Sequence, residues 1–320
     1  MKAIVVEQYG GPEELKLREM PEWHPIAGQV LVEIKAASVN PKDAQYRNGL
    51  YPSLHMPPFT PGIDGAGIVL SVGKGVTNVS VGDRVFISSS ISGTYAEKAL
   101  CHAHHVHLLS DNVSFAEGAG VGVAYATAFR ALYQRALAVP GETILIHGAS
   151  GGVGLAALQL ARNAGFFIIG TAGTPEGMQL VKNEGADIVV CHREPDYLKQ
   201  MISLNHNNKI DVILEMQAQI NLGNDLTLLA KNGRVVVIGS LGTIEIDSQY
   251  LKDSDGKILS VSMLLATKEE MALNYHALQR CLKRGLIKPI INEQIPLNEA
   301  AKAHQIIEQT GQKGKIILVP

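Results

Sequence analysis

A glycine-rich turn at residues 148–154 constrains the fold of this chain more than any other sequence feature. The run Gly-Ala-Ser-Gly-Gly-Val-Gly follows an apolar strand pattern at Thr143–His147 and opens a helical pattern at Val153–Asn163. Glycines at this spacing allow a tight turn and close backbone approach to a pyrophosphate, whose charge is met by unpaired N–H groups and the helix dipole. The strand-turn-helix context favours a dinucleotide site over the alternative, a turn that serves only helix–sheet packing.

The strand-helix alternation continues after this turn. Thr174 and Pro175 have the residue types of a helix cap and a first helical position, and Gly185 is placed to end that helix. Five further strands are predicted, at Phe166–Gly170, Ile188–Val190, Ile210–Leu214, Val235–Ile238 and Ile258–Leu265. Strands that alternate with helices are typical of a parallel sheet wound on both faces, so the fold class is α/β.

The first third of the chain has a different pattern, with short strands between turns. Alternating apolar residues at 30–36 and glycine-bounded runs at Gly67–Val72 and Arg84–Ile87 predict a β-rich domain. A helix near Leu297–Gln309 and a strand at Lys315–Val319 end the chain. The change of pattern therefore predicts two domains, one β-rich and one that binds a nucleotide.

Composition limits the partners and the compartment. The formal charge is -2 from 28 basic and 30 acidic residues, so no global field favours nucleic acid or an anionic membrane. No apolar run is long enough to span a bilayer, and Glu7 interrupts any signal-peptide pattern. Three widely spaced cysteines indicate reduced thiols rather than disulfides. These features predict a cytoplasmic protein that acts on small molecules.

The residues after the second strand of the nucleotide-binding domain indicate the cofactor. An NAD-preferring site places Asp or Glu about 20 residues beyond the glycine motif to bind the ribose hydroxyls. This chain has Thr-Ala-Gly-Thr at 171–174, with no carboxylate to repel a 2′-phosphate. His192 and Arg193, just after the third strand, could donate hydrogen bonds to that phosphate. NADPH is therefore predicted over NADH.

Several motifs across the whole chain resemble those of zeta-crystallin type quinone reductases, the zinc-independent branch of the medium-chain dehydrogenase/reductase superfamily. The matching runs are 39–41, 61–64, 82–86, 91–93, 95–97, 147–155, 170–174, 239–240 and 242–246, together with Asn221. The resemblance implies a GroES-like catalytic and substrate domain, from residues 1–123 and 287–320, that is interrupted by a Rossmann NADPH-binding domain from residues 124–286.

The same resemblance implies the site residues. Cofactor contacts would come from Ser150, Gly151, Gly152, Val153, Gly173, His192, Asn221, Ile238, Gly239, Ser240, Leu241, Val261, Ser262 and Met263. Asn40 and Tyr51 match residues that line the active site of the family. The family commonly has tyrosine five residues after the asparagine, whereas this chain has Gln45 followed by Tyr46. We expect Asn40, Gln45, Tyr46 and Tyr51 to shape the acceptor side.

No metal is expected. No cysteine lies near Asn40, and the run Pro-Gly-Ile-Asp at 61–64 lacks the histidine that the zinc branch places before its acidic residue. The only competing feature is the histidine-rich run at 101–107, in which His105 and His107 would share one face of a strand. A zinc site needs three or four converging ligands, so we interpret these as surface histidines.

Three functions remain open at this point. The resemblance favours an NADPH-dependent quinone oxidoreductase, and a reductase of activated C=C bonds in 2-alkenals or enones would use the same two domains. An NADPH-binding structural or RNA-associated protein is the alternative of another class. In each case we expect a homodimer or a dimer of dimers, because the apolar strand at 258–265 would lie at a sheet edge.

Overall fold

The computed structural model describes all residues 1–320, and the chain divides into two compact units. The first unit contains Met1–Val123 and Ala277–Pro320, and the second contains Ala124–His276. The chain thus leaves the first unit, forms the second, and returns. The finer boundary at 286/287 that the sequence suggests stays a prediction.

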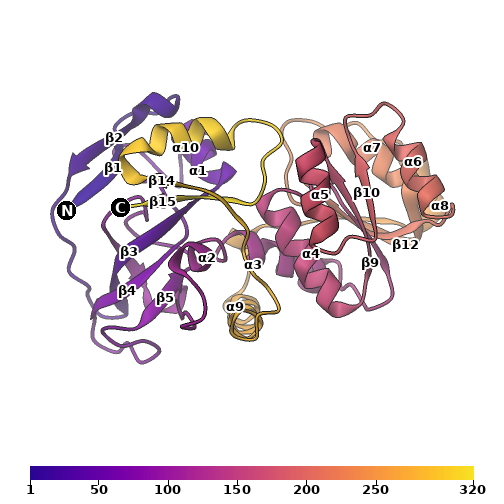
Figure 1. The fold of residues 1–320 in the computed structure, drawn as a ribbon. Coiled ribbons are helices and arrows are strands. Elements are labelled where there is room, and N and C mark those ends of the chain that lie inside the picture. The colour runs from indigo at the N-terminus through magenta and orange to yellow at the C-terminus, as the bar shows by residue number, and fades with distance from the viewer. The chain divides into compact units, whose positions relative to one another are not determined.

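The second unit is built on a six-stranded parallel sheet with strand order β10-β9-β8-β11-β12-β13. Its strands are β8 (Thr143–Ile146), β9 (Phe167–Ala172), β10 (Ile188–Cys191), β11 (Ile210–Glu215), β12 (Leu229–Val237) and β13 (Lys257–Ser260). Helices α4 (Gly152–Ala164) and α5 (Pro175–Asn183) pack on β8–β10, and α6 (Tyr197–Leu204), α7 (Ala218–Leu228) and α8 (Gln249–Ser254) pack on β10–β12 (Figure 1). This is the predicted doubly wound Rossmann sheet.

Local sequence signals explain where these helices begin and end. The Thr174 hydroxyl accepts a hydrogen bond from the Gly177 N–H at 3.1 Å and caps α5, as predicted. Gly165 ends α4 in the left-handed conformation (φ 81°), which glycine adopts without a Cβ penalty. The remaining helices of this unit are α3 (Ala124–Phe129), a π-helical turn (Arg130–Arg135) and the first part of α9 (Lys268–Lys283).

The predicted strand at 258–265 is wrong in its second half. β13 ends at Ser260, and Met263–Leu265 form a short 3-10 turn. The physical reason is that β12, the only neighbour of β13 in the sheet, ends at Val237 opposite Ser260. Beyond that point the strand has no partner for its backbone hydrogen bonds.

The first unit holds a seven-stranded sheet and a two-stranded ribbon. The ribbon is β1 (Lys2–Val6) with β2 (Leu15–Glu19). The sheet runs β14-β15-β3-β4-β5-β7, and β6 also pairs with β3. Its strands are β3 (Gln29–Val39), β4 (Gly65–Val72), β5 (Arg84–Ile87), β6 (Lys98–His102), β7 (Val106–Leu108), β14 (Ile291–Pro296) and β15 (Lys315–Val319). Its helices are α1 (Pro41–Arg47), α2 (Phe115–Ala119), the last part of α9 and α10 (Ala300–Ile307).

The last strand of the chain returns to this sheet. β15 pairs antiparallel with β3, so the last strand lies beside an N-terminal one (yellow and indigo in Figure 1). The apolar alternation predicted along β3 is confirmed, since Val30, Val32 and Ile34 are all at most 2% exposed. These side chains are part of the core of the unit.

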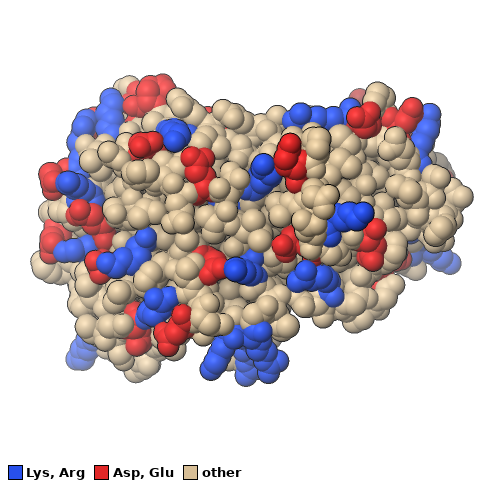
Figure 2. Space-filling model, in the orientation of Figure 1, with Lys and Arg blue, Asp and Glu red and all other residues tan.

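The surface carries mixed charges. On the face shown in Figure 2, acidic and basic side chains are interspersed, with one basic group over α9. That distribution agrees with the near-neutral formal charge and shows no broad field of one sign on this face. No helix of the structure has the length and apolar character that a membrane span requires.

Close packing of β3 on β4 gives a test of the first unit. A Cβ added to Gly67 would lie 1.8 Å from the backbone oxygen of Glu33, and relieving this overlap would require one of the two strands to shift. We expect Gly67→Ala to destabilise the protein by about 2 kcal/mol, lowering the thermal midpoint by several degrees. Gly223→Ala, where the added carbon meets nothing within 4 Å in α7, should be neutral or slightly stabilising. Equal midpoints for the two variants in calorimetry would contradict this packing.

Candidate active site

The predicted cofactor residues gather at one edge of the second unit's sheet. Parallel strands end at a common edge, where nucleotides bind in open α/β sheets. The residues follow successive strand ends: 150–153 after β8, Gly173 after β9, His192 after β10, Asn221 on the helix after β11, 238–241 after β12, and 261–263 after β13. The fold thus brings together segments that are up to 113 residues apart in sequence, from residue 150 to residue 263.

Hydrogen bonds to β9 hold the glycine turn, and the turn leads directly into helix α4. The Gly148 N–H donates to the Thr171 hydroxyl oxygen (3.1 Å), and the Ala149 N–H donates to the Thr171 carbonyl (2.8 Å). A Cβ on Gly154 would lie 2.4 Å from the Gly148 carbonyl oxygen, so only glycine permits this approach of helix to turn. Gly151 caps the 13-residue helix α4, whose first N–H groups have no partner within the helix and suit an anionic group.

A basic pair lies where an NAD-preferring site would have a carboxylate. A Cβ built on Gly173 would be 2.7 Å from His192 Nε2 and 3.0 Å from Arg193 Nε. The Thr171 hydroxyl lies 3.3 Å from His192 Nδ1 and fixes the ring. Burial, with the nearby charges of His147 and Arg193, lowers the pKa of His192, so the imidazole is neutral and Arg193 supplies the charge. These residues fit the 2′-phosphate of NADPH.

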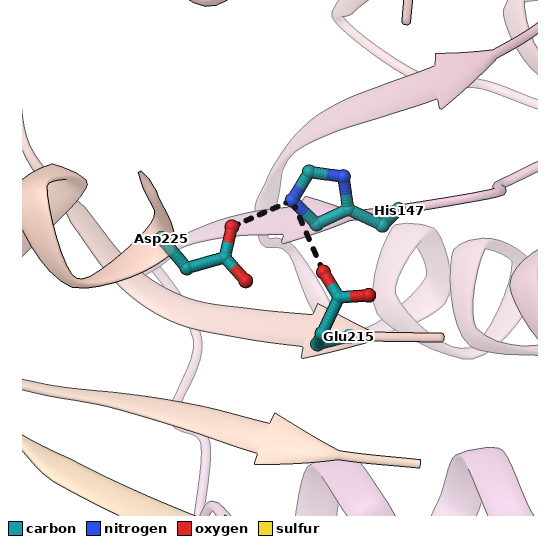
Figure 3. A group of neighbouring side chains, drawn as sticks. All are labelled: His147, Glu215 and Asp225. Atoms are coloured by element: carbon teal, nitrogen blue, oxygen red, sulfur yellow. Dashed lines mark hydrogen bonds and ion pairs between the residues drawn. The ribbon is translucent and has the colours of Figure 1, made fainter. Parts of the chain in front are cut away.

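Sequence reasoning missed a buried group of three side chains behind this edge (Figure 3). His147 follows β8, Glu215 ends β11, and Asp225 lies on α7. His147 Nε2 is 2.8 Å from Asp225 Oδ1 and 3.5 Å from Glu215 Oε2, and all three are at most 3% exposed. Although burial opposes it, the hydrogen bond to Asp225 and the two carboxylates raise the pKa of His147. The sequence did offer a signal for this group, because a polar residue ends each of two apolar strand patterns: His147 after β8 and Glu215 at the end of β11.

The acceptor-side residues come from α1 and the segment after it in the first unit. Tyr46 is 7% exposed, whereas Tyr51 is 37% exposed, and their rings meet edge to face at 5.8 Å. Burial, then the nearby charge of Asp43, raises the pKa of Tyr46 to about 12. Gln45 is half-buried on the same helix. Tyr46 therefore faces inward beside Tyr51, and Gln45 stands at the position of the family tyrosine.

Two further side chains join this group. Lys42 Nζ lies 3.2 Å from the centroid of the Tyr51 ring and 5.5 Å from that of Tyr46. The His55 ring is 4.3 Å from Tyr46. The four-residue spacing of Lys42 and Tyr46 on a helix was a signal that sequence analysis could have used.

Asn40 is held in a buried network. It is 2% exposed; its Nδ2 donates to Asp64 Oδ1 (2.7 Å) and Asp43 Oδ2 (3.2 Å), and its Oδ1 accepts from Lys315 Nζ (2.6 Å). Burial, then the neighbouring Asp64, raises the pKa of Asp43 to about 7. Each polar atom of the Asn40 side chain has a protein partner, so Asn40 orders the start of α1 from within.

The same network does not fit a zinc ion. The Lys315 ammonium is the cation beside Asp43 and Asp64, and the carboxylate of Asp64 already accepts from Asn40 and the Val123 N–H.

The histidine run at 101–107 is arranged otherwise than predicted: His105 lies in a 3-10 turn (Ala103–His105), not on the strand of His107. His107 packs on Phe86 at 4.9 Å and pairs with the Ser88 hydroxyl at 3.1 Å.

Comparisons with known proteins agree with this arrangement. The family model "Alcohol dehydrogenase GroES-like domain" matches residues 26–142, and "Zinc-binding dehydrogenase" matches residues 152–278. Together they define a medium-chain dehydrogenase/reductase with the predicted GroES-like and Rossmann domains. Human quinone oxidoreductase is 44% identical over 100% of this chain and 98% of its own length. The chain belongs to the quinone oxidoreductase family of that superfamily.

Solved structures support the same placement. The Escherichia coli quinone oxidoreductase complexed with NADPH matches with a TM-score of 0.91 and 29% identity over 100% of both chains. CurK enoyl reductase matches with a TM-score of 0.90 and 25% identity over 99% of this chain and 98% of that one.

The Asn40 network predicts a specific sensitivity. Lys315→Met would leave two buried carboxylates without their cation, and we expect a loss of about 3 kcal/mol in stability at pH 8. A carboxyl whose folded pKa is raised makes stability fall as pH rises toward that pKa, so the loss should be smaller at pH 6. The half-exposed Lys302, paired at 3.5 Å with Glu293 and Glu299, is the control: Lys302→Met should cost less than about 1 kcal/mol. Unfolding curves that rank the two variants equally would refute the assignment.

Proposed function

We propose that this protein is an NADPH-dependent quinone oxidoreductase that transfers reducing equivalents to quinones without a metal. The observation that carries the proposal is the pairing of His192 and Arg193 at Gly173, beside a glycine turn built for a pyrophosphate, in a chain of the quinone oxidoreductase family. Small quinones are the acceptors, and a cytoplasmic location, consistent with three free cysteines, is part of the proposal.

The work of the chain in this reaction is binding and orientation. NADPH, when bound, supplies the hydride. The start of α4 would hold its pyrophosphate, Arg193 and His192 its 2′-phosphate, and Asn221 with residues 238–241 and 261–263 the rest of the dinucleotide. On the first unit, Tyr51 and Gln45 would contact the acceptor, while Tyr46 supports Tyr51 from behind. Quinones become negatively charged at oxygen on reduction, and the Lys42 ammonium beside Tyr51 would stabilise that charge.

A reductase of activated C=C bonds is the second candidate. Gln45 favours it, because a half-buried amide in place of an aromatic ring offers a hydrogen bond to the carbonyl of an enone or 2-alkenal. The structural likeness to an enoyl reductase is compatible with it. Quinone oxidoreductase activity is preferred because it matches the family to which the whole chain belongs.

A preference for NADPH follows from the basic pair at Gly173. We expect NADPH to bind at least about tenfold more tightly than NADH, a difference of about 1.4 kcal/mol. Arg193→Ala should remove most of the difference by weakening NADPH alone, whereas Arg280→Ala, an exposed position on α9, should change neither affinity. Fluorescence titration with both cofactors measures this, and equal wild-type affinities would exclude the assigned phosphate site.

The acceptor preference can be tested on kcat/KM. With NADPH, 1,4-benzoquinone and a naphthoquinone should outperform a medium-length 2-alkenal, and alcohols should not be oxidised at a useful rate. Gln45→Tyr should lower the alkenal rate relative to the quinones, and Tyr51→Phe should report whether the exposed phenol contributes. A wild-type preference for the alkenal would show that the protein is a reductase of activated C=C bonds. The absence of turnover with every acceptor would favour a binding protein.

Assembly as a homodimer, or a dimer of dimers, is the third expectation. β13 ends the parallel sheet, and Ile258 on it is 37% exposed, so pairing with the same strand of a second copy would cover an open edge. Light scattering at micromolar concentration should give at least twice the monomer mass. Ile258→Lys should shift the equilibrium toward monomer, and Ile220→Lys, on the exposed face of α7, should not. A monomeric wild type would disprove the pairing.

A further inference from the structure

The buried trio of His147, Glu215 and Asp225 has no role in the function proposed above, and its position suggests one. Glu215 has two distinct oxygens: Oε2 faces His147 at 3.5 Å, and Oε1 accepts hydrogen bonds from Asn221 Nδ2 (3.2 Å) and from the Gln217 N–H. The carboxylate therefore ties the trio to Asn221, one of the predicted cofactor residues, and orients that side chain.

The other side of the trio reaches the glycine turn. His147 is bonded to Gly148 along the chain, and its N–H donates to the Leu214 carbonyl of β11 at 3.1 Å. The Gly148 N–H in turn shares the Thr171 hydroxyl with His192 Nδ1. One connected set of contacts thus joins Asn221, the glycine turn and His192, all at the edge where the strands end.

The trio is too costly to be a neutral part of the core. Two carboxylates and one imidazole are removed from water, and Glu215 Oε2 and Asp225 Oδ2 have no hydrogen-bond partner. Apolar side chains of similar volume would fill this space without the desolvation penalty. A role in ordering the ligand site in front of it would explain why a polar group occupies this place despite the desolvation penalty.

We propose that Glu215, held by His147 and Asp225, is a positioning residue for NADPH, setting Asn221 and the glycine turn in the geometry that binds the cofactor. This inference rests on the proposed NADPH binding and assigns it a residue that does not touch the ligand. Its expected signature is a change in cofactor affinity that loss of fold stability alone does not explain.

The trio also makes NADPH binding depend on pH. Burial raises the pKa of Glu215 to about 7, against the opposing effect of the His147 charge. The other titratable groups that act on Glu215 are Asp225 of α7 and Tyr197 of α6, whose pKa burial raises to about 12. His192, beyond β10, interacts with His147 rather than with Glu215. As pH rises through 7, Glu215 gains a negative charge behind the site of an anionic cofactor, so affinity should fall.

The test compares isosteric variants. In Glu215→Gln, the amide oxygen can still accept from Asn221, but the amide nitrogen then faces His147 Nε2 and breaks the trio; Asp225→Asn breaks it from the other side. Both should weaken NADPH binding about tenfold at pH 7. Glu142→Gln removes the Arg234 ion pair (2.6 Å) at the opposite end of the same sheet, and it should lower the thermal midpoint while leaving NADPH affinity unchanged.

A double-mutant cycle and a pH series separate positioning from a structural role. If Glu215 acts through Asn221, then adding Glu215→Gln to Asn221→Ala should weaken NADPH binding by less than about twofold further. From pH 6 to 8 the wild type and Glu142→Gln should lose affinity in parallel, and Glu215→Gln should lose less.

Full additivity in the cycle, or unchanged NADPH affinity in Glu215→Gln and Asp225→Asn, would overturn the inference while leaving the proposed function intact. A divalent ion bound stoichiometrically at the trio, found by elemental analysis and lost in Asp225→Asn, would also overturn it, because the carboxylates would then be ligands. Failure of the wild type to bind NADPH would instead refute the proposed function.

Discussion

The common carboxyl edge of the six parallel strands is the constraint on which the rest of the site depends. Each strand delivers the residues that follow it to one line, so six short segments converge without any long loop. The central strand β8 ends in the glycine turn, and its neighbour β9 supplies Thr171, which holds that turn. Its other neighbour, β11, supplies Glu215, which accepts a hydrogen bond from Asn221. Register in the sheet therefore sets the geometry of the cofactor site.

Both units place buried charge directly behind their predicted ligand-contacting residues. In the first unit Lys315, Asp43 and Asp64 hold Asn40; in the second His147, Asp225 and Glu215 hold Asn221. In each case an asparagine amide is oriented by carboxylates that water does not reach. Low local polarity strengthens such hydrogen bonds and penalises any alternative rotamer, which makes the amide more rigid than a surface asparagine.

The sequence predicted most of the fold because its signals were local. The glycine turn, the Thr174 cap and the β-branched runs each depend on residues within a few positions, and every one of these elements forms. The second half of the 258–265 strand failed because its partner β12 ends earlier, which no local pattern reveals. The buried trio and the Lys315 contact join residues 78 and 275 positions apart, so only the folded chain brings them together.

All side-chain hydrogen bonds of Asn40 are made within the protein, so other residues would have to recognise the acceptor. An amide that already donates to two carboxylates and accepts from an ammonium would have to break a charge-assisted bond to reach a substrate. The side chains on α1 and just after it that are not fully buried include those of Gln45, Tyr51 and Lys42. Two of these, Gln45 and Lys42, are polar or charged where an aromatic wall would be apolar. Acceptor choice in this protein should therefore depend more on carbonyl oxygens and developing negative charge than on ring stacking.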